Sequence, residues 1–313
     1  MKFPVFDLHC DTAEKLIRFG DSEPAELKCN SAHVDLNRAA VFPGYTQCFA
    51  CFTTPDSVVN PVDLFEKKMT AVLREISKNY QIITQVFDPD EIESNMSNGL
   101  ISAILTIEGP AGFGFDPELL EDLHKVGFRM STLGWNEKNP LTGSHITGGG
   151  LTDMGREYVK EAQRLGMIID VSHISDEGFW DIVDITQAPI VASHSNSRSV
   201  CNVSRNLTDD MFVQICKTGG VAGVNFVADF LSENPTIDTV CDHIFRFMEL
   251  DPTGKHIALG GDLDGCDILP AGFDGIQGYP LLAERLIQRG LDEQTVYDIF
   301  WNNALEVFKR CCT

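Results

Sequence analysis

Basic residues are scarce in this sequence. Its 24 lysines and arginines stand against 46 aspartates and glutamates, so the formal net charge at pH 7 is −22. A chain with this charge repels the phosphates of nucleic acids and the anionic surfaces of membranes. We therefore exclude nucleic-acid binding and membrane binding as functions, and we expect neither kind of partner.

Long hydrophobic runs are also absent. No stretch approaches the roughly 20 apolar residues of a transmembrane helix, and Asp7 comes too early for the apolar core of a signal peptide. The sequence therefore predicts a cytoplasmic protein. Its 313 residues, 43% of them hydrophobic, are enough to bury one large core. No repeat or low-complexity segment interrupts them, so we expect a single domain over residues 1–313.

Cysteine is too infrequent for a disulfide scaffold. The chain has 10 cysteines, and without an export signal we expect them to stay reduced. Cys48 and Cys51 form a CxxC pair, but they lie in an alternating apolar run and are interpreted as strand packing, with a redox or zinc role as the alternative. The adjacent Cys311 and Cys312 receive no functional assignment.

Short β-branched runs alternate with segments of helical periodicity, a pattern typical of parallel sheets with crossover helices. The predicted strands are residues 5–10, 46–52, 101–107, 127–133, 167–172, 190–193, 220–226 and 257–261. The predicted helices are residues 61–81, 117–126, 152–165, 175–184, 209–218, 236–250, 279–289 and 292–309. This succession predicts an α/β protein with a (β/α)8 TIM barrel, and an open doubly wound sheet is the alternative.

Polar side chains cluster at the ends of the predicted strands. Each of them alone is readily explained as a helix cap or a satisfied structural group. Together they are three histidines and three carboxylates at the rim where a barrel carries its active site, and these residue types suit zinc or a similar divalent ion. The six candidates are His9, Asp11, Glu108, His173, His194 and Asp262.

These candidates divide into two half-sites and one remaining acid. His9 and Asp11 can hold one ion, His173 and His194 a second, and Glu108 can bridge the two with one oxygen on each. Two cations that share a water or hydroxide lower its pKa and polarise a substrate carbonyl, which is hydrolytic chemistry. Asp262 then remains free to take a proton from the water and to deliver it to a leaving amine.

Ordered blocks along nearly the whole chain resemble the membrane dipeptidase family, also called renal-dipeptidase-like peptidases, and its soluble bacterial members in particular. The blocks are residues 7–12, 106–109, 150–152, 166–173, 193–195, 205–206, 224–226 and 260–265. The resemblance implies a (β/α)8 barrel with two zinc ions held by the five ligands above, Asp262 as catalytic acid/base, and Arg205 as the residue that binds the free carboxylate of a dipeptide. A surface salt bridge of Arg205 to Asp209 or Asp210 is the alternative.

The sequence departs from the renal-type pattern in two respects. Trp135 stands where those enzymes carry a substrate-contacting histidine, so oxyanion stabilisation must come from the metal or another donor such as Asn136. A tyrosine expected after Asn225 and Phe226 is replaced by Val227. These changes affect substrate choice and leave the metal ligands intact.

The leading hypothesis is a binuclear zinc dipeptidase that cleaves small dipeptides and tolerates a D-amino acid at the carboxyl-terminal position. One alternative is a related amidohydrolase acting on N-acyl amino acids or lactones, and another is a metal-containing barrel that binds a partner without turnover. A small dipeptide is the expected partner, and homodimer formation is left open.

Overall fold

The computed structural model describes residues 3–17 and 23–312. Eight parallel strands form a sheet in the order β7-β6-β5-β4-β2-β1-β9-β8. A parallel bridge between Ala192 and Ala222 joins its two ends, so the sheet closes into a barrel rather than staying open, and the prediction of a (β/α)8 barrel is confirmed. The barrel strands are β1 (Val5–Cys10), β2 (Tyr45–Phe52), β4 (Ile101–Glu108), β5 (Phe128–Thr132), β6 (Ile168–Asp170), β7 (Ile190–Val191), β8 (Ala222–Val224) and β9 (Ile257–Leu259).

One further strand was missed by the sequence analysis. The strand β3 (Ile83–Gln85) pairs with the first three residues of β4, on the edge of β4 that β5 contacts further along. Its three residues are too few to give a periodic signal.

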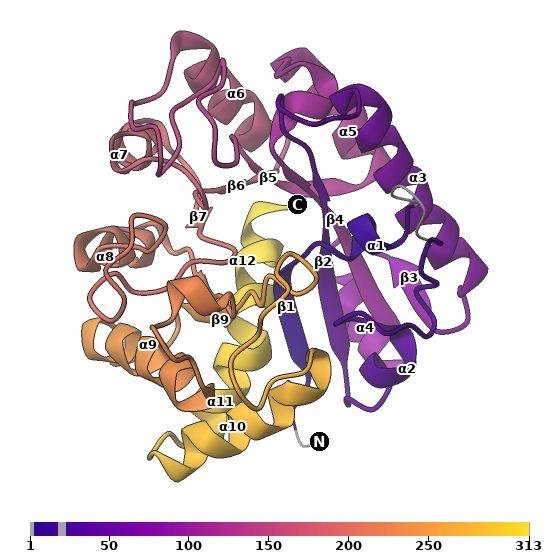
Figure 1. The fold of residues 1–313 in the computed structure, drawn as a ribbon, viewed down its shortest axis with the longest axis vertical. Helices are drawn as coiled ribbons and strands as arrows, with labels where there is room; N and C mark the ends of the chain where they lie inside the picture. Colours follow the sequence, from indigo (N-terminus) through magenta and orange to yellow (C-terminus); the bar gives the residue numbers. More distant parts are fainter. Residues whose placement is uncertain (1–2, 18–22, 313) are drawn as a thin grey trace.

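Most helices surround the barrel and cover its outer face, whereas the carboxyl-terminal helix lies over its middle (Figure 1). The longer ones are α3 (Pro61–Lys78), α4 (Glu91–Ser97), α5 (Leu120–Val126), α6 (Asp153–Arg164), α7 (Asp176–Ile185), α8 (Asp209–Thr218), α9 (Ile237–Leu250), α10 (Tyr279–Gln288) and α12 (Asn303–Cys311). The shorter ones are α1 (Thr12–Lys15), α2 (Leu36–Ala39) and α11 (Glu293–Tyr297), and the 3-10 turns are η1 (Pro110–Phe113), η2 (Pro117–Leu119), η3 (Ala228–Phe230) and η4 (Ile276–Gly278). No helix within the described residues is both long and apolar enough to cross a membrane.

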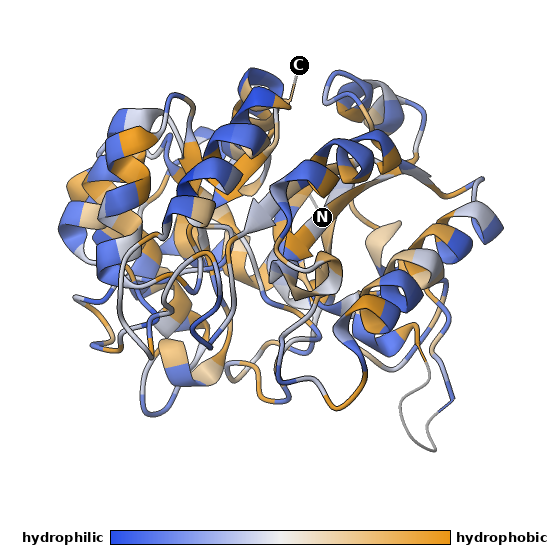
Figure 2. Ribbon diagram, turned by 90° about the horizontal axis from the view of Figure 1, so that it is seen from above, coloured by the Kyte–Doolittle hydropathy of each residue, from blue (hydrophilic) through white to orange (hydrophobic). Residues whose placement is uncertain are grey.

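The capping residues explain where several helices begin. Thr152, Ser175 and Thr208 each accept a hydrogen bond from a backbone N–H in the first turn of the helix that follows, which satisfies one of the free donors at a helix start. Figure 2 shows hydrophilic (blue) and hydrophobic (orange) residues in separate stripes along the helices of the molecule.

The sequence predicts one regular closing helix over residues 292–309, and the structure is helical there but not regular. A π-helical turn, η5 (Asp298–Asn302), separates α11 from α12. At this turn Asn303 donates hydrogen bonds to the backbone oxygens of Gly254 and Ile257. These partners lie far away in the sequence, so local periodicity does not reveal the wider turn.

Two apolar clusters form the core, and they lie on opposite sides of the strands. Phe6, Ile104 and Met130 belong to the smaller one, which Trp301 and Phe308 of the last helical segment complete. The ring centroid of Phe6 lies 6.1 Å from that of Trp301 and 5.2 Å from that of Phe308. The carboxyl-terminal segment thus packs directly against barrel residues.

Cys48 and Cys51 both lie in β2, and each packs into a different one of the two clusters. Burial raises the pKa of Cys51 to about 12. Both thiols are free and buried, which agrees with the interpretation of the CxxC pair as strand packing. Cys311 is half-buried at the end of α12 and Cys312 is buried.

Candidate metal centre

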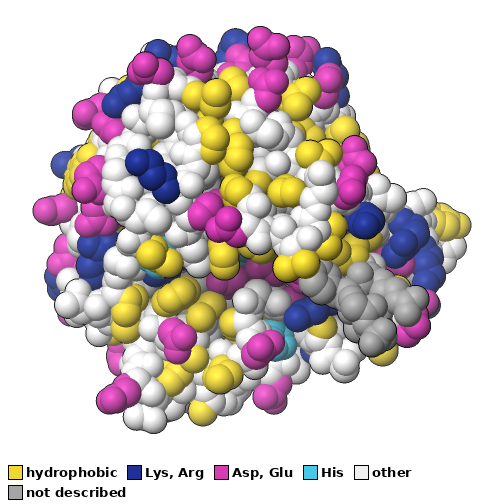
Figure 3. Space-filling model, turned by 45° about the horizontal axis from the view of Figure 1, so that its top comes forward, with side chains coloured by type: hydrophobic (Ala, Val, Ile, Leu, Met, Phe, Trp, Pro, Cys, Tyr) yellow, Lys and Arg dark blue, Asp and Glu magenta, His cyan; other side chains and the backbone are white. Residues whose placement is uncertain are grey.

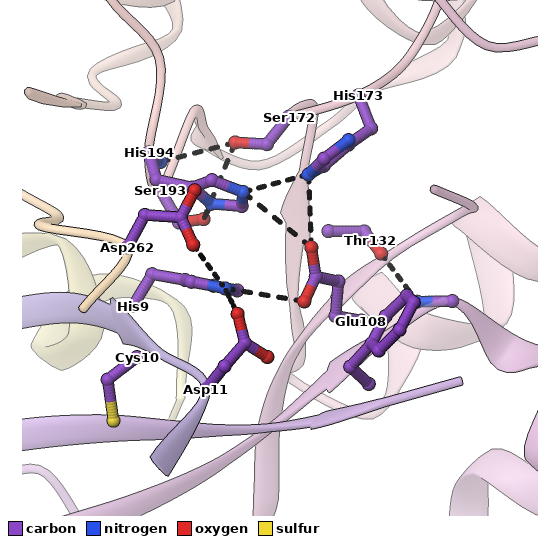
Figure 4. A network of polar contacts seen from close by, with 12 residues as sticks. His9, Cys10, Asp11, Glu108, Thr132, Ser172, His173, Ser193, His194 and Asp262 are labelled. Carbon is purple, nitrogen blue, oxygen red and sulfur yellow. Dashed lines mark hydrogen bonds and ion pairs between the residues drawn. The ribbon is translucent and has the colours of Figure 1, made fainter. Parts of the chain in front are cut away.

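The five predicted metal ligands and the predicted acid/base meet at the carboxyl-terminal mouth of the barrel (Figure 4). His9 lies near the end of β1 and Asp11 directly after it, while Glu108 is the last residue of β4. The remaining three follow β6, β7 and β9 by three residues each. They are His173, His194 and Asp262.

The backbone is in the left-handed region at two of these residues. The φ angles are 68° at His173 and 54° at Asp262. Non-glycine residues rarely adopt such angles, which cost on the order of 1–3 kcal/mol each and are concentrated at functional sites. The surrounding fold therefore pays a cost to place these two side chains in the mouth.

Glu108 lies at the centre of the cluster and is 3% exposed. Its Oε2 is 3.3 Å from Nε2 of His9. Its Oε1 is 3.0 Å from Nε2 of His173 and 3.7 Å from Nε2 of His194. The two oxygens of one carboxylate therefore face two separate groups of imidazole nitrogens.

A chain of hydrogen bonds fixes the tautomer of His194. The Ser193 hydroxyl donates its proton to Asp170 Oδ2, a very short contact. Its oxygen lies 2.6 Å from His194 Nδ1, so it can only accept a proton there, and Nδ1 must carry one. The lone pair of His194 is therefore on Nε2, which faces Glu108.

Asn136 fixes the tautomer of His173 in the same way. Its Oδ1 lies 3.1 Å from His173 Nδ1 and 2.9 Å from His145 Nε2, and an amide oxygen only accepts. The lone pair of His173 is therefore also on Nε2. The Nε2 atoms of His173 and His194 are 2.9 Å apart, so two lone pairs and a carboxylate oxygen meet without a proton among them.

His9 lies on the opposite side of the cluster. Nε2 of His9 is buried and has no hydrogen-bond partner. It lies 3.5 Å from Asp11 Oδ2 and 3.9 Å from Asp262 Oδ1, and its ring stacks on that of His194 with a centroid distance of 3.8 Å. A buried nitrogen among carboxylate oxygens is an arrangement that a bound cation satisfies.

The electrostatics of the cluster also favour a cation. Burial raises the pKa of Glu108 to about 7, and repulsion by Asp11 and Asp262 acts in the same direction. Burial likewise raises the pKa of Asp262 to about 6, assisted by Asp11 and opposed by His9 and Arg205. Burial lowers the pKa of His173 and of His194 well below the ordinary value, which keeps both imidazoles in the neutral form that binds metals.

Three further residues support the cluster, and the sequence did not reveal their roles. Asp7 is buried and accepts hydrogen bonds from the backbone N–H groups of His9 and Gly261. Asn225 donates from Nδ2 to Asp262 Oδ2 over 3.0 Å. A Cβ added to Gly265 would collide with the carboxylates of Asp11 and Asp262, so only glycine leaves these two groups their present positions.

The cluster opens into a cavity of about 250 Å³. In Figure 3 acidic side chains (magenta) lie in a hollow of the surface, among apolar ones (yellow). Trp135 lines the cavity and packs edge-on against Phe52, with ring centroids 4.9 Å apart. The lining residues are Asp11, Glu14, Phe52, Glu108, Trp135, Asn136, His173, Val227, Phe230, Asp262, Asp264 and Gly265.

Arg205 is buried beside this cavity. Its Nη1 donates to Ser195 Oγ over 2.7 Å and its Nη2 to the backbone oxygen of His194 over 2.9 Å. Its Nε has no partner, and its guanidinium carbon lies 5.7 Å from the ring centre of Phe230. The alternative prediction of a surface salt bridge between Arg205 and Asp209 is wrong. Asp209 pairs with Arg246 instead.

Imidazoles with free lone pairs and crowded carboxylates, at the carboxyl-terminal mouth of a (β/α)8 barrel, are typical of the metal centre of a metal-dependent hydrolase. The residues present therefore fit a divalent ion such as zinc. The chain belongs to the membrane dipeptidase family: the sequence model of Membrane dipeptidase (Peptidase family M19) matches residues 1–312. The resemblance inferred from the sequence blocks is thus confirmed.

Similar proteins agree with this membership. An uncharacterized dipeptidase of Schizosaccharomyces pombe is 38% identical over 216 residues, which are 67% of this chain and 53% of that protein. The chain therefore aligns with about half the length of this relative. A second uncharacterized dipeptidase of the same organism is 30% identical over 302 residues, 90% of this chain and 72% of its own.

Among solved structures, a metallo peptidase from Rhodobacter sphaeroides superposes with a TM-score of 0.89 at 25% identity. The match covers 99% of this chain and 100% of the other. That peptidase was crystallised with a phosphinate mimic of the dipeptide L-Ala-D-Ala.

Proposed function

We propose that this protein is a binuclear zinc dipeptidase, with residues 1–313 as one catalytic domain. The observation that carries the proposal is the position of Glu108, whose two carboxylate oxygens face imidazole nitrogens on opposite sides of the cluster. His9 and Asp11 would hold one ion, His173 and His194 the other, and Glu108 would bridge them. Bound there, the metal lowers the pKa of a water molecule and polarises a peptide carbonyl.

Asp262 is the acid/base of this proposal. Its Oδ2 is held by Asn225, while its Oδ1 lies on the side of His9, at 3.9 Å from Nε2. One carboxylate oxygen is therefore fixed, and the other is directed into the mouth. Asp262 can take the proton of the attacking water at this oxygen and pass it to the leaving amine.

Arg205 would bind the free carboxylate of the substrate. A guanidinium has five N–H donors, and two of its nitrogens each use one on the protein. The remaining donors include the buried, unpartnered Nε. A carboxylate is the acceptor that satisfies such a fork through parallel charge-assisted hydrogen bonds.

Asn136 and Trp135 would shape the substrate site. Because Asn136 Oδ1 already accepts from two imidazoles, its Nδ2 is the group left to donate to a substrate carbonyl oxygen. Trp135 and Phe52 narrow the cavity, whose volume of about 250 Å³ suits a small dipeptide. The L-Ala-D-Ala mimic bound by the Rhodobacter peptidase supports tolerance of a carboxyl-terminal D-amino acid.

A steady-state screen tests the proposal, with metal content measured on the same sample. Small L,L- and L,D-dipeptides are compared with N-acetyl amino acids and lactones. We expect hydrolysis of dipeptides by protein that holds about two zinc ions per chain, and loss of activity on chelation that zinc restores. Full zinc content without cleavage of any dipeptide would refute the function, and cleavage of the acyl or lactone substrates alone would favour the amidohydrolase alternative.

A further inference from the structure

A second group of metal-ligand types lies far from the catalytic mouth. Cys216 is in the last turn of α8, Asp251 follows α9, and His256 directly precedes β9. One ligand atom of each lies within 4.8 Å of those of the other two. We propose that these three side chains bind a divalent transition metal, zinc by its chemistry, at the amino-terminal end of the barrel.

The imidazole of His256 is in the tautomer that a metal ligand needs. Its Nδ1 lies 2.7 Å from the backbone oxygen of Gly220. A carbonyl oxygen only accepts, so Nδ1 carries the proton and the lone pair is on Nε2. A backbone carbonyl that holds the second nitrogen of a histidine is the usual support of a metal-ligating imidazole.

The carboxylate of Asp251 is rigidly held and lacks a counter-charge. Its Oδ1 accepts hydrogen bonds from the backbone N–H and the hydroxyl of Thr253, and its Oδ2 accepts from the backbone N–H of His256. The residue is only 9% exposed. Within the described ranges no lysine or arginine forms an ion pair with it, so a bound cation would supply the missing positive charge.

Cys216 determines which cation fits. Its thiol is free and half-buried, and burial together with the charge of Asp251 raises its pKa to about 12. Binding of M²⁺ would break the S–H bond, form the metal–sulfur bond and release H⁺ to solvent. One thiolate and one carboxylate then neutralise the ion, and a sulfur, nitrogen and oxygen donor set favours zinc over magnesium or calcium.

The proposed site would connect elements that lead to the catalytic mouth. Cys216 lies in the last turn of the helix that follows the Arg205 loop, and His256 directly precedes the strand that leads to Asp262. Gly220, whose carbonyl holds His256, lies two residues before β8. An ion there would tie the start of β9 to the ends of α8 and α9, so we assign it a structural role.

Cobalt substitution tests this site separately from the catalytic one. Co²⁺ bound to a thiolate gives an intense near-ultraviolet charge-transfer band, and none of the proposed catalytic ligands is a cysteine. We expect the metal-free protein titrated with Co²⁺ to show this band. Cys216→Ser should abolish it and lower the bound metal by one per chain, whereas Cys29→Ser, at an exposed free thiol, should leave both unchanged.

A second variant covers the case that Cys216→Ser does not fold. His256→Gln keeps the thiol, and we expect at least a tenfold weaker Co²⁺ affinity read from the same band. Absence of the band from the wild-type protein, or its persistence in Cys216→Ser, for instance through Cys266, would overturn the proposal. The result is independent of the dipeptidase proposal, because His194→Ala should lose activity and keep the thiolate band.

Discussion

Replacement of Asp170 by asparagine probes the hydrogen-bond chain behind His194. Asp170 Oδ1 accepts the backbone N–H groups of Ser172 and Ser193, each over 2.9 Å. The amide oxygen of asparagine can keep both bonds. Its NH₂ group replaces Oδ2, so the Ser193 hydroxyl loses the acceptor for its proton and the negative charge behind His194 disappears.

The expected effect is a weaker metal site in an unchanged fold. Loss of such an outer hydrogen bond costs 10–100-fold in metal affinity, which corresponds to roughly 1.4–2.8 kcal/mol. Because both backbone bonds to Oδ1 survive, the melting temperature of the metal-free protein should change little. We expect the ion next to His173 and His194 to be lost first.

Competition with a coloured chelator measures these affinities, and calorimetry of the metal-free protein measures its stability. Ser193→Ala interrupts the same chain, so the double variant should lose no more affinity than the stronger single one. Asp181→Asn is the matched control, because Asp181 also accepts a backbone N–H, that of Leu151, and pairs with Arg156 rather than with a metal ligand. Wild-type affinity for both ions in Asp170→Asn would refute the reasoning.

Three further outcomes are expected at the mouth itself. Asp262→Asn should retain both ions and lower kcat by about 10²–10⁴-fold, since general acid–base catalysis contributes on this scale; an unchanged kcat by steady-state kinetics would contradict its role. Arg205→Lys should raise KM for dipeptides by roughly 10-fold or more with a smaller change in kcat, because one charge-assisted hydrogen bond is worth about 1.5–3 kcal/mol, and an equal KM would exclude carboxylate binding. Gly265→Ala should reduce the zinc content measured by elemental analysis, because its Cβ would displace Asp11 and Asp262; full zinc occupancy would show that the collision relaxes elsewhere.

The sequence alone determined the barrel and the chemical character of its mouth. Each barrel strand is a short apolar run of its own, and a buried parallel strand must be apolar over its length, so polar residues at its end are conspicuous. That contrast pointed to His9, Glu108 and His194 without knowledge of any contact. It did not reveal β3, whose three residues carry no period, or the π-helical turn before Asn303, which depends on carbonyl groups distant in the sequence.

Tertiary structure alone decided how these residues act on one another. Asp170 ends β6, and only the pairing of β6 with β7 brings it beside Ser193 and His194. The proposed site of Cys216, Asp251 and His256 has no recognisable ligand spacing, because its members come from the ends of different elements. Residue types and periodicity are local properties, whereas a tautomer, an unpaired lone pair or an uncompensated buried charge exists only once distant groups have been brought within a few ångströms.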